Sequence, residues 1–285
     1  MNSIRSLYAT IVLCSASILQ GQNTNHAIHS DAVVTDRREI PFEEPENFPA
    51  AAFPLISGAR VVWLGELHGT NESPALFLGL VRLVSLNDRP PVVALEIPHG
   101  DQAAIDEYLK TGDDAVLKTR TFFSADAASK DGRASRAMAK LLERLRGEKV
   151  ARVVCIDPAP VKWDERDQGM ASNIAECVER FPSLKVLVLT GNAHSRVTRG
   201  TPWDKKYQPA AFLLKKTVQP VMTFDSHYQT GSFWGHTNEG LGEHKIAGEH
   251  WNGSARHYIS FGSEPVQGHQ GVIFSRTVSA SPPWP

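Results

Sequence analysis

Four short, continuous runs of apolar residues constrain the fold of this chain more than any other feature of its sequence. The runs do not alternate apolar with polar residues, which is typical of parallel strands that are covered on both faces. They lie at residues 60–64, 91–95, 150–156 and 184–190. Segments with apolar residues at helical spacing lie between these runs, at residues 72–86, 101–109, 133–145 and 164–181. This alternation predicts an α/β fold with a mostly parallel sheet and helices on both faces.

The organisation of the chain follows from this pattern. Its 285 residues are enough for one large α/β domain, which we expect over residues 59–285. Residues 231–255 are rich in Gly, His and Glu and are expected to form a looser excursion, while 219–224 and 271–274 could be further strands. Residues 22–58 are polar and then proline-rich, so we expect a lead-in that packs on the surface.

The first 21 residues have the pattern of a targeting segment. Arg5 is followed by an apolar run from Leu7 to Leu19 that is too short to span a bilayer as a helix. This arrangement predicts a secretory signal peptide over residues 1–21 and a periplasmic or secreted protein without a stable membrane span. A buried N-terminal helix is the alternative.

Charge and cysteine content exclude several classes of protein. Lys and Arg total 30 and Asp and Glu total 31, for a formal net charge of −1, so no basic surplus exists to bind a nucleic acid backbone. Three cysteines are too few for a disulfide scaffold and lack the spacing of a structural zinc site. Cys155 and Cys177 are expected to be buried thiols, with a disulfide as the alternative. The oligomeric state is left open.

Ionisable residues follow three of the predicted strands at the point where each strand ends. Glu66 and His68 follow the first strand, Glu96 ends the second and His194 follows the fourth. Because ligands bind outside the carboxyl ends of strands in open α/β sheets, these four side chains are expected to converge on one rim. The structural alternatives are a capping or core role for His68 and an ion pair with an arginine for Glu96.

The helical segment 164–181 brings a second group of candidates. Asp167 lies on one face with Met170 and Ile174, at the head of the apolar stripe. Arg166 lies beside it and could pair with Glu66 or Glu96, or hold a developing oxyanion. The alternative is an exposed charged cluster at a helix start. Arg133, in another helical segment, reaches the same cleft or merely solvates its helix end.

Four short motifs in this order resemble one superfamily of proteins. They are Gly65-Glu66-Leu67-His68-Gly69, Glu96, Glu165-Arg166-Asp167 and Gly191-Asn192-Ala193-His194. The superfamily contains the erythromycin esterase-like hydrolases, the ChaN-like haem-binding lipoproteins and, more distantly, the TraB/GumN and Tiki proteins. The resemblance covers roughly residues 59–235.

The resemblance implies an α/β fold in which six side chains line one cleft. They are Glu66, His68, Glu96, Arg166, Asp167 and His194. In the esterase-like members a histidine of the first motif resembles the general base that activates water, and His68 occupies that place here. The spacing Glu66-Leu67-His68 is closer to the ChaN-like pattern, so macrolide esterase activity is not implied.

Two functions from different classes follow. The first is a hydrolase of an ester or amide bond in a small molecule or peptide, with His68 as base and Arg166 and His194 stabilising the oxyanion. No Gly-x-Ser-x-Gly motif occurs, so a serine triad is not expected. If the enzyme needs a metal, Glu66, His68, Glu96 and His194 are suitable ligands for Mn, Co or Zn.

The second function is a ChaN-like protein that binds haem or another small ligand without turnover. Four histidines in or near the C-terminal excursion would favour it, unless they lie on a solvated loop. They are His236, His244, His250 and His257.

Overall fold

The structure, a computed structural model, describes residues 38–120, 122–123, 131–159, 162–248 and 250–284. The expected signal peptide over residues 1–21 and the first part of the lead-in lie outside the described residues. No helix within the described ranges is long and apolar enough to cross a membrane.

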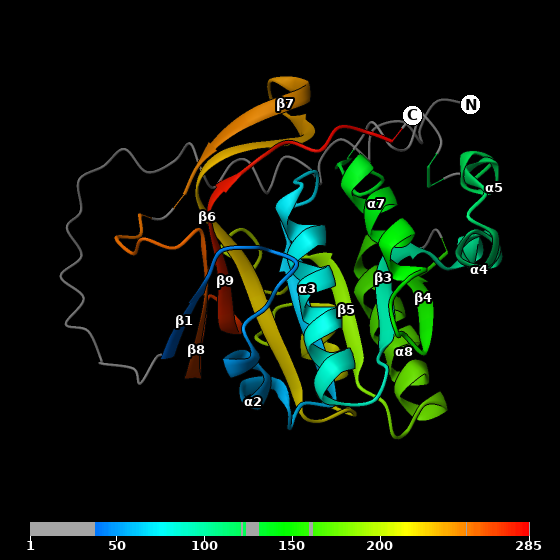
Figure 1. Cartoon of the computed structure of the whole chain (residues 1–285), viewed down its shortest axis with the longest axis horizontal. Coiled ribbons are helices and arrows are strands. Elements are labelled where there is room, and N and C mark those ends of the chain that lie inside the picture. Colours follow the sequence, from blue (N-terminus) through cyan, green and yellow to red (C-terminus); the bar gives the residue numbers. More distant parts are fainter. Residues whose placement is uncertain (1–37, 121, 124–130, 160–161, 249, 285) are drawn as a thin grey trace.

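Nine strands form one mixed sheet with the order β1-β8-β9-β6-β2-β5-β3-β4, and β7 pairs with β6 (Figure 1). The neighbours from β9 through β4 run parallel, whereas β1, β7 and β8 pair antiparallel. The strands are β1 (Arg38–Phe42), β2 (Val61–Glu66), β3 (Val92–Pro98), β4 (Arg152–Asp157), β5 (Val186–Gly191), β6 (Val221–Thr237), β7 (Gly240–Ala247), β8 (His257–Val266) and β9 (His269–Val278). The predicted mostly parallel sheet is confirmed.

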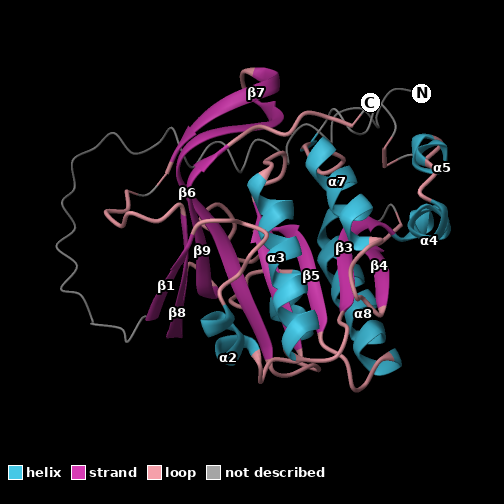
Figure 2. Ribbon diagram, in the orientation of Figure 1, coloured by secondary structure: helices cyan, strands magenta, loops and turns pink. Residues whose placement is uncertain are grey.

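Helices cover both faces of this sheet, as predicted. Figure 2 shows α3 and α7 lying across the near face, where the core contains Leu64, Leu95 and Leu189. The opposite face, with Trp63 and Val188, is covered by α8 and α9. The two cores separate because successive side chains of a strand point to opposite faces. The helices are α2 (Phe53–Ile56), α3 (Glu72–Asn87), α4 (Gln102–Thr111), α5 (Asp114–Lys118), α7 (Arg136–Leu145), α8 (Trp163–Arg180) and α9 (Ala210–Leu214), with single 3-10 turns η1 (Ala50–Ala52) and η2 (His99–Asp101).

Two segments are more regular than the sequence pattern indicated. Residues 38–42 of the lead-in form β1, whose Ile40 and Phe42 are buried where β1 pairs with β8. Much of the expected excursion at 231–255 is the end of β6 and the strand β7, which pair from Thr230↔Ala247 to Thr237↔Gly240. The sequence of β7, GLGEHKIA, lacks the apolar run that predicted the central strands.

The C-terminal segment after β9 passes over the loops that lead from the sheet rim. Figure 1 shows this segment, in red, running across the top of the sheet towards α7. The Ser281 amide donates to the Gly69 carbonyl, and the Trp284 amide donates to the Ala134 carbonyl. These contacts hold the loop that follows β2 and the turn that precedes α7 side by side.

Both described cysteines are buried and free. The expectation of two buried thiols is therefore confirmed for Cys155 and Cys177, and the alternative of a disulfide between them is wrong. Burial raises the pKa of Cys177 to about 11, so the thiol stays protonated at neutral pH.

Candidate functional site

The carboxyl ends of four neighbouring parallel strands form the candidate site. Glu66 is the last residue of β2, Glu96 lies near the end of β3, Asp157 ends β4 and Gly191 ends β5. The three acidic side chains are buried. Parallel pairing places these strand ends at one edge, so the sequence expectation that they share a rim agrees with the structure.

Glu96 is the central anion of this rim. The Gly191 amide donates to its Oε2 at 2.7 Å, and Nη2 of Arg166 donates to its Oε1 at 2.5 Å. Nη1 of Arg133 donates to the same Oε1 at 3.3 Å. Burial raises the pKa of Glu96, but the positive charge of Arg166 and the nearby histidines and Arg133 bring that pKa well below its usual value. Glu96 is therefore an ionised carboxylate at neutral pH.

Asp157 completes a closed network with the two guanidinium groups. Nε and Nη2 of Arg166 donate to Oδ1 and Oδ2 of Asp157 at 2.8 and 2.9 Å, and Nη1 of Arg133 donates to Oδ2 at 2.7 Å. Nε of Arg133 also donates to Asp131 at 2.8 Å. The bidentate pairing with Asp157 fixes the plane of the Arg166 guanidinium group, and the contacts of Nε and Nη1 with separate carboxylates orient that of Arg133. The structural alternative for Glu96, an arginine ion pair, is thus part of the site itself.

His68 is the more accessible of the two rim histidines, His68 and His194. Its Nδ1 lies 2.9 Å from Oε1 of Glu66, and its Nε2 lies 3.6 Å from Oε2 of Glu96. The His68 side chain is 22% exposed, whereas those of Glu66 and Glu96 are 4% and 3% exposed. When Nδ1–H donates a hydrogen bond to Oε1 of Glu66, the neutral imidazole carries its lone pair on Nε2.

His194 lies deeper and both of its nitrogens contact the protein. Its Nδ1 is 2.8 Å from Oδ1 of Asp167, and its Nε2 is 3.1 Å from Nη1 of Arg166. Asp167 is itself held by the Tyr207 hydroxyl, which donates to Oδ2 at 2.8 Å, and by the Ala210 amide, which donates to Oδ1 at 2.7 Å. The His194 side chain is 7% exposed and its Nε2 contacts Arg166, and its expected role at the oxyanion stays a prediction.

The structure therefore brings all six residues of the sequence prediction together and adds others. Their catalytic role stays a prediction. The additional members are Asp131, Arg133, Asp157 and Tyr207. Asp157 directly follows the third apolar run, so the strand-end rule that found Glu66 and Glu96 could have found it. Tyr207 lies in the loop before α9 and was not among the candidate site residues.

The expected metal ligands are not arranged as a metal site. Within the described part of the chain, no group of three or more His, Cys, Asp or Glu residues could hold a metal ion. Two arginines pair with Glu96, and a guanidinium group is not a metal ligand. The donor set around Glu96 consequently does not fit Mn, Co or Zn.

The histidines of the C-terminal region lie on different elements. His244, on β7, lies within hydrogen-bond distance of the Thr237 hydroxyl and the Gly240 carbonyl. His257, on β8, is buried, and its Nδ1 lies 2.9 Å from the Ser275 hydroxyl. His236 is on β6 and His250 follows β7.

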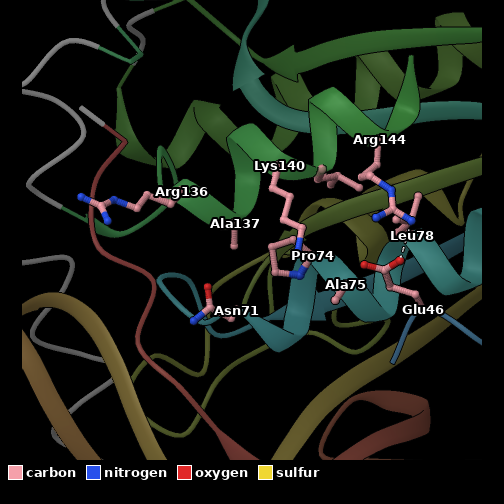
Figure 3. Close-up of a pocket in the computed structure, with 10 residues that line it drawn as sticks. Glu46, Asn71, Pro74, Ala75, Leu78, Arg136, Ala137, Lys140 and Arg144 are labelled. Carbon is pink, nitrogen blue, oxygen red and sulfur yellow. Dashed lines mark hydrogen bonds and ion pairs between the residues drawn. The ribbon is translucent and has the colours of Figure 1, made fainter. Parts of the chain in front are cut away.

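A separate groove lies between the N-terminal half of α3 and α7, with a volume of about 210 Å³. Figure 3 shows Lys140 reaching towards Pro74 in this groove and Arg144 pairing with Glu46 at one end. None of the residues predicted for the rim lines it. Because the charged groups that line it are surface side chains, we assign no function to this groove.

Gly65 is required where β2 meets the loop that carries His194. A Cβ at this position would lie 2.1 Å from the Ser195 hydroxyl oxygen and 2.8 Å from the Asn192 Cα. We expect Gly65→Ala to lower the free energy of unfolding by about 1–3 kcal/mol, because backbone atoms must shift. Gly58→Ala, which meets no atom within 4 Å, is the matched control. Equal urea midpoints for the two variants would contradict this prediction.

No family model matches the sequence, and no curated protein matches it. The fold is nevertheless that of solved structures. A variant of the erythromycin esterase EreC in its open conformation matches with a TM-score of 0.64 and 11% identity, covering 86% of this chain and 98% of that chain. The protein is thus an α/β protein with the fold of erythromycin esterase.

Two further solved structures show the same fold. A succinoglycan biosynthesis protein matches with a TM-score of 0.61 and 11% identity, over 86% of this chain and 96% of that chain. A protein from Bacillus cereus matches with a TM-score of 0.59 and 11% identity, over 87% and 97% of the two chains. The haem-binding ChaN of Campylobacter jejuni is more distant, with a TM-score of 0.43 and 12% identity over 79% of this chain and 91% of that chain. The expected erythromycin esterase-like α/β fold is confirmed.

Proposed function

We propose that this protein hydrolyses an ester or amide bond of a small molecule or peptide, with His68 as the general base that activates water. The observation that carries the proposal is the orientation of His68. Glu66 fixes Nδ1, and the side chain remains partly exposed at the rim. That arrangement presents Nε2 as a proton acceptor near Glu96, the carboxylate that Arg133 and Arg166 both contact. The fold shared with erythromycin esterase supports the same chemistry by analogy.

Arg133 supplies the positive charge for the developing oxyanion in this proposal. Its Nε and Nη1 are engaged with Asp131, Glu96 and Asp157, whereas its Nη2 makes no hydrogen bond with the described residues. The Arg133 side chain is 21% exposed, so Nη2 is available to a substrate. Arg166 holds Arg133 indirectly, since both guanidinium groups contact the same two carboxylates. Preorganised donors of this kind stabilise a tetrahedral intermediate without reorganisation.

From the pattern of residues 1–21 we also propose that the protein acts in the periplasm or outside the cell. Its substrate would therefore be met after export. This localisation is tested by fractionating cells that express the full chain and locating the protein by immunoblotting.

The test of the proposed activity is a panel of 4-nitrophenyl esters, 4-nitroanilides and peptides, assayed between about pH 5 and about pH 9. Burial lowers the pKa of His68, but the charge of Glu96 and the hydrogen bond and charge of Glu66 raise this pKa above 6.5. A base must be deprotonated, so kcat/KM is expected to rise with pH to a half-maximum above pH 6.5.

The variant Glu66→Gln tests whether this rise of kcat/KM with pH reports the deprotonation of His68. Glutamine keeps a hydrogen-bond acceptor for Nδ1 but removes the negative charge that raises the pKa of His68, so the half-maximum is expected to move to lower pH. Absence of turnover across the whole panel would remove the hydrolase proposal. If kcat/KM of Glu66→Gln reached its half-maximum at the wild-type pH, His68 would not be the group that titrates.

A further inference from the structure

A second polar cluster lies beneath the rim, on the sheet face that carries α8 and α9. It consists of Asp225 on β6, His269 at the start of β9 and Ser195 in the loop after β5. The three residues are 5%, 1% and 0% exposed. No step of the proposed hydrolysis uses them, and their burial keeps Ser195 out of reach of a substrate.

The three side chains form a chain of polar contacts. The Ser195 hydroxyl lies 2.8 Å from Nε2 of His269 and donates to the Asn192 carbonyl at 3.0 Å. His269 Nδ1 lies 3.6 Å from Oδ2 of Asp225, beyond hydrogen-bond distance, and has no hydrogen-bond partner among the described residues. If Nε2 of His269 carries the proton, it donates to the Ser195 hydroxyl oxygen, and the Ser195 hydroxyl donates in turn to the Asn192 carbonyl.

This chain of contacts ends on the turn that presents His194. Asn192 and Ser195 flank His194 in the sequence, and Ser195 binds across the turn to Asn192. The Asn192 amide donates to the Glu66 carbonyl at 3.0 Å, so the same turn also contacts the end of β2. The close approach of Ser195 and Asn192 to Gly65 leaves no space into which the turn could relax.

The cluster is expensive to bury, which argues against a packing role. Burial raises the pKa of Asp225, but His269, His227 and Asn192 lower this pKa below its usual value, so Asp225 is ionised. An ionised carboxylate and a histidine with one unsatisfied nitrogen cost more than apolar side chains of the same size. Buried polar groups of this kind specify one conformation of the chain around them.

We propose that Ser195, His269 and Asp225 are positioning residues that set the orientation of His194 and, through it, of Arg166. His194 Nε2 contacts Arg166, which in turn holds Glu96 and Asp157. The catalytic meaning of this positioning rests on the proposed hydrolase function, whereas the structural link from Ser195 to His194 does not.

The variant Ser195→Ala tests the link, and Ser275→Ala is its matched control. Ser275 makes the same kind of contact, at 2.9 Å to the buried His257, but on β8 and β9 away from the rim. Each variant loses one buried His–Ser hydrogen bond, and Ser195→Ala also loses the bond to the Asn192 carbonyl, so a decrease in Tm is expected for both and the larger one for Ser195→Ala. The readout is the imidazole ¹⁵N chemical shifts of His194 in the full chain.

Ser195→Ala is expected to shift or broaden the His194 imidazole signals, and Ser275→Ala to leave them as in the wild type. If the panel yields a substrate, kcat/KM is expected to fall about tenfold or more in Ser195→Ala alone, as small misplacements of a site do. His194 signals unchanged in Ser195→Ala, or moved equally by Ser275→Ala, would overturn the proposal. A wild type without hydrolase activity would remove only the proposed function, because the ¹⁵N readout is independent of turnover.

Two substitutions of His269 separate the contact from general packing. Glutamine can place an amide nitrogen near the position of Nε2 and restore the contact with Ser195, whereas leucine cannot. His269→Gln is expected to keep the wild-type His194 signals, and His269→Leu to shift them. Identical spectra for the two variants would also overturn the proposal.

Discussion

Replacing His68 by asparagine is expected to reduce kcat/KM for the best substrate of the panel by about 10²–10⁴-fold, the contribution typical of a general base. Asparagine can still donate a hydrogen bond to Glu66 from nearly the position of Nδ1, so the local contact is kept. What is lost is Nε2, the atom that accepts the proton. Because His68 is partly exposed, Tm should change little.

The control for this variant is His257→Asn. It removes a buried imidazole that contacts Ser275 and stacks on Phe42, so it tests whether loss of any histidine reduces activity through the fold. We expect His257→Asn to lower Tm more than His68→Asn but to keep near wild-type kcat/KM per folded molecule. Activity that survives in His68→Asn would assign the base to another group.

The largest effect on stability is expected from Arg166→Met. Methionine fills much of the same volume but removes the main counter-charge of Glu96 and Asp157. Arg133 then remains as the arginine that contacts both carboxylates. Removing one partner of a buried ion pair typically costs about 3–5 kcal/mol, since the remaining charge stays desolvated. We expect the free energy of unfolding in urea to fall by about this amount.

Arg82→Met is the matched control, because Arg82 on α3 also pairs with two carboxylates, Glu46 and Glu148. Those partners are 25% and 21% exposed, so water screens their charges after the substitution. We expect Arg82→Met to cost about 1 kcal/mol or less. A small effect of Arg166→Met, equal to that of Arg82→Met, would show that the rim network is not held by its charges.

The strand-end rule worked for the site because it depends only on local sequence and on the parallel sheet. The continuous apolar runs predicted β2, β3, β4 and β5, and the polar residues at their ends then had to lie at one edge. The same rule would have included Asp157, which ends β4. It could not reveal that Arg133 and Arg166 both bind Glu96, because neither residue lies on a strand.

The antiparallel part of the sheet was harder to predict. β7 and β1 have few consecutive apolar residues, and each is a strand because a neighbour supplies its hydrogen bonds. The cluster of Ser195, His269 and Asp225 likewise has no local signal. Ser195 and His269 are 74 residues apart in the sequence, and they meet only because the loop after β5 packs against β9.

The sequence by itself determined the α/β class, the central parallel strands and the set of ionisable residues at the rim. Periodicity and strand length are properties of neighbouring residues, so they can be read before the chain is folded. Only the tertiary structure decided the partners of each charge, the accessibility of His68 and the burial of His194. These depend on contacts such as that between Gly191 and Glu96, which are 95 residues apart. Desolvation and charge pairing, which set the chemistry of the rim, exist only once such distant segments have packed together.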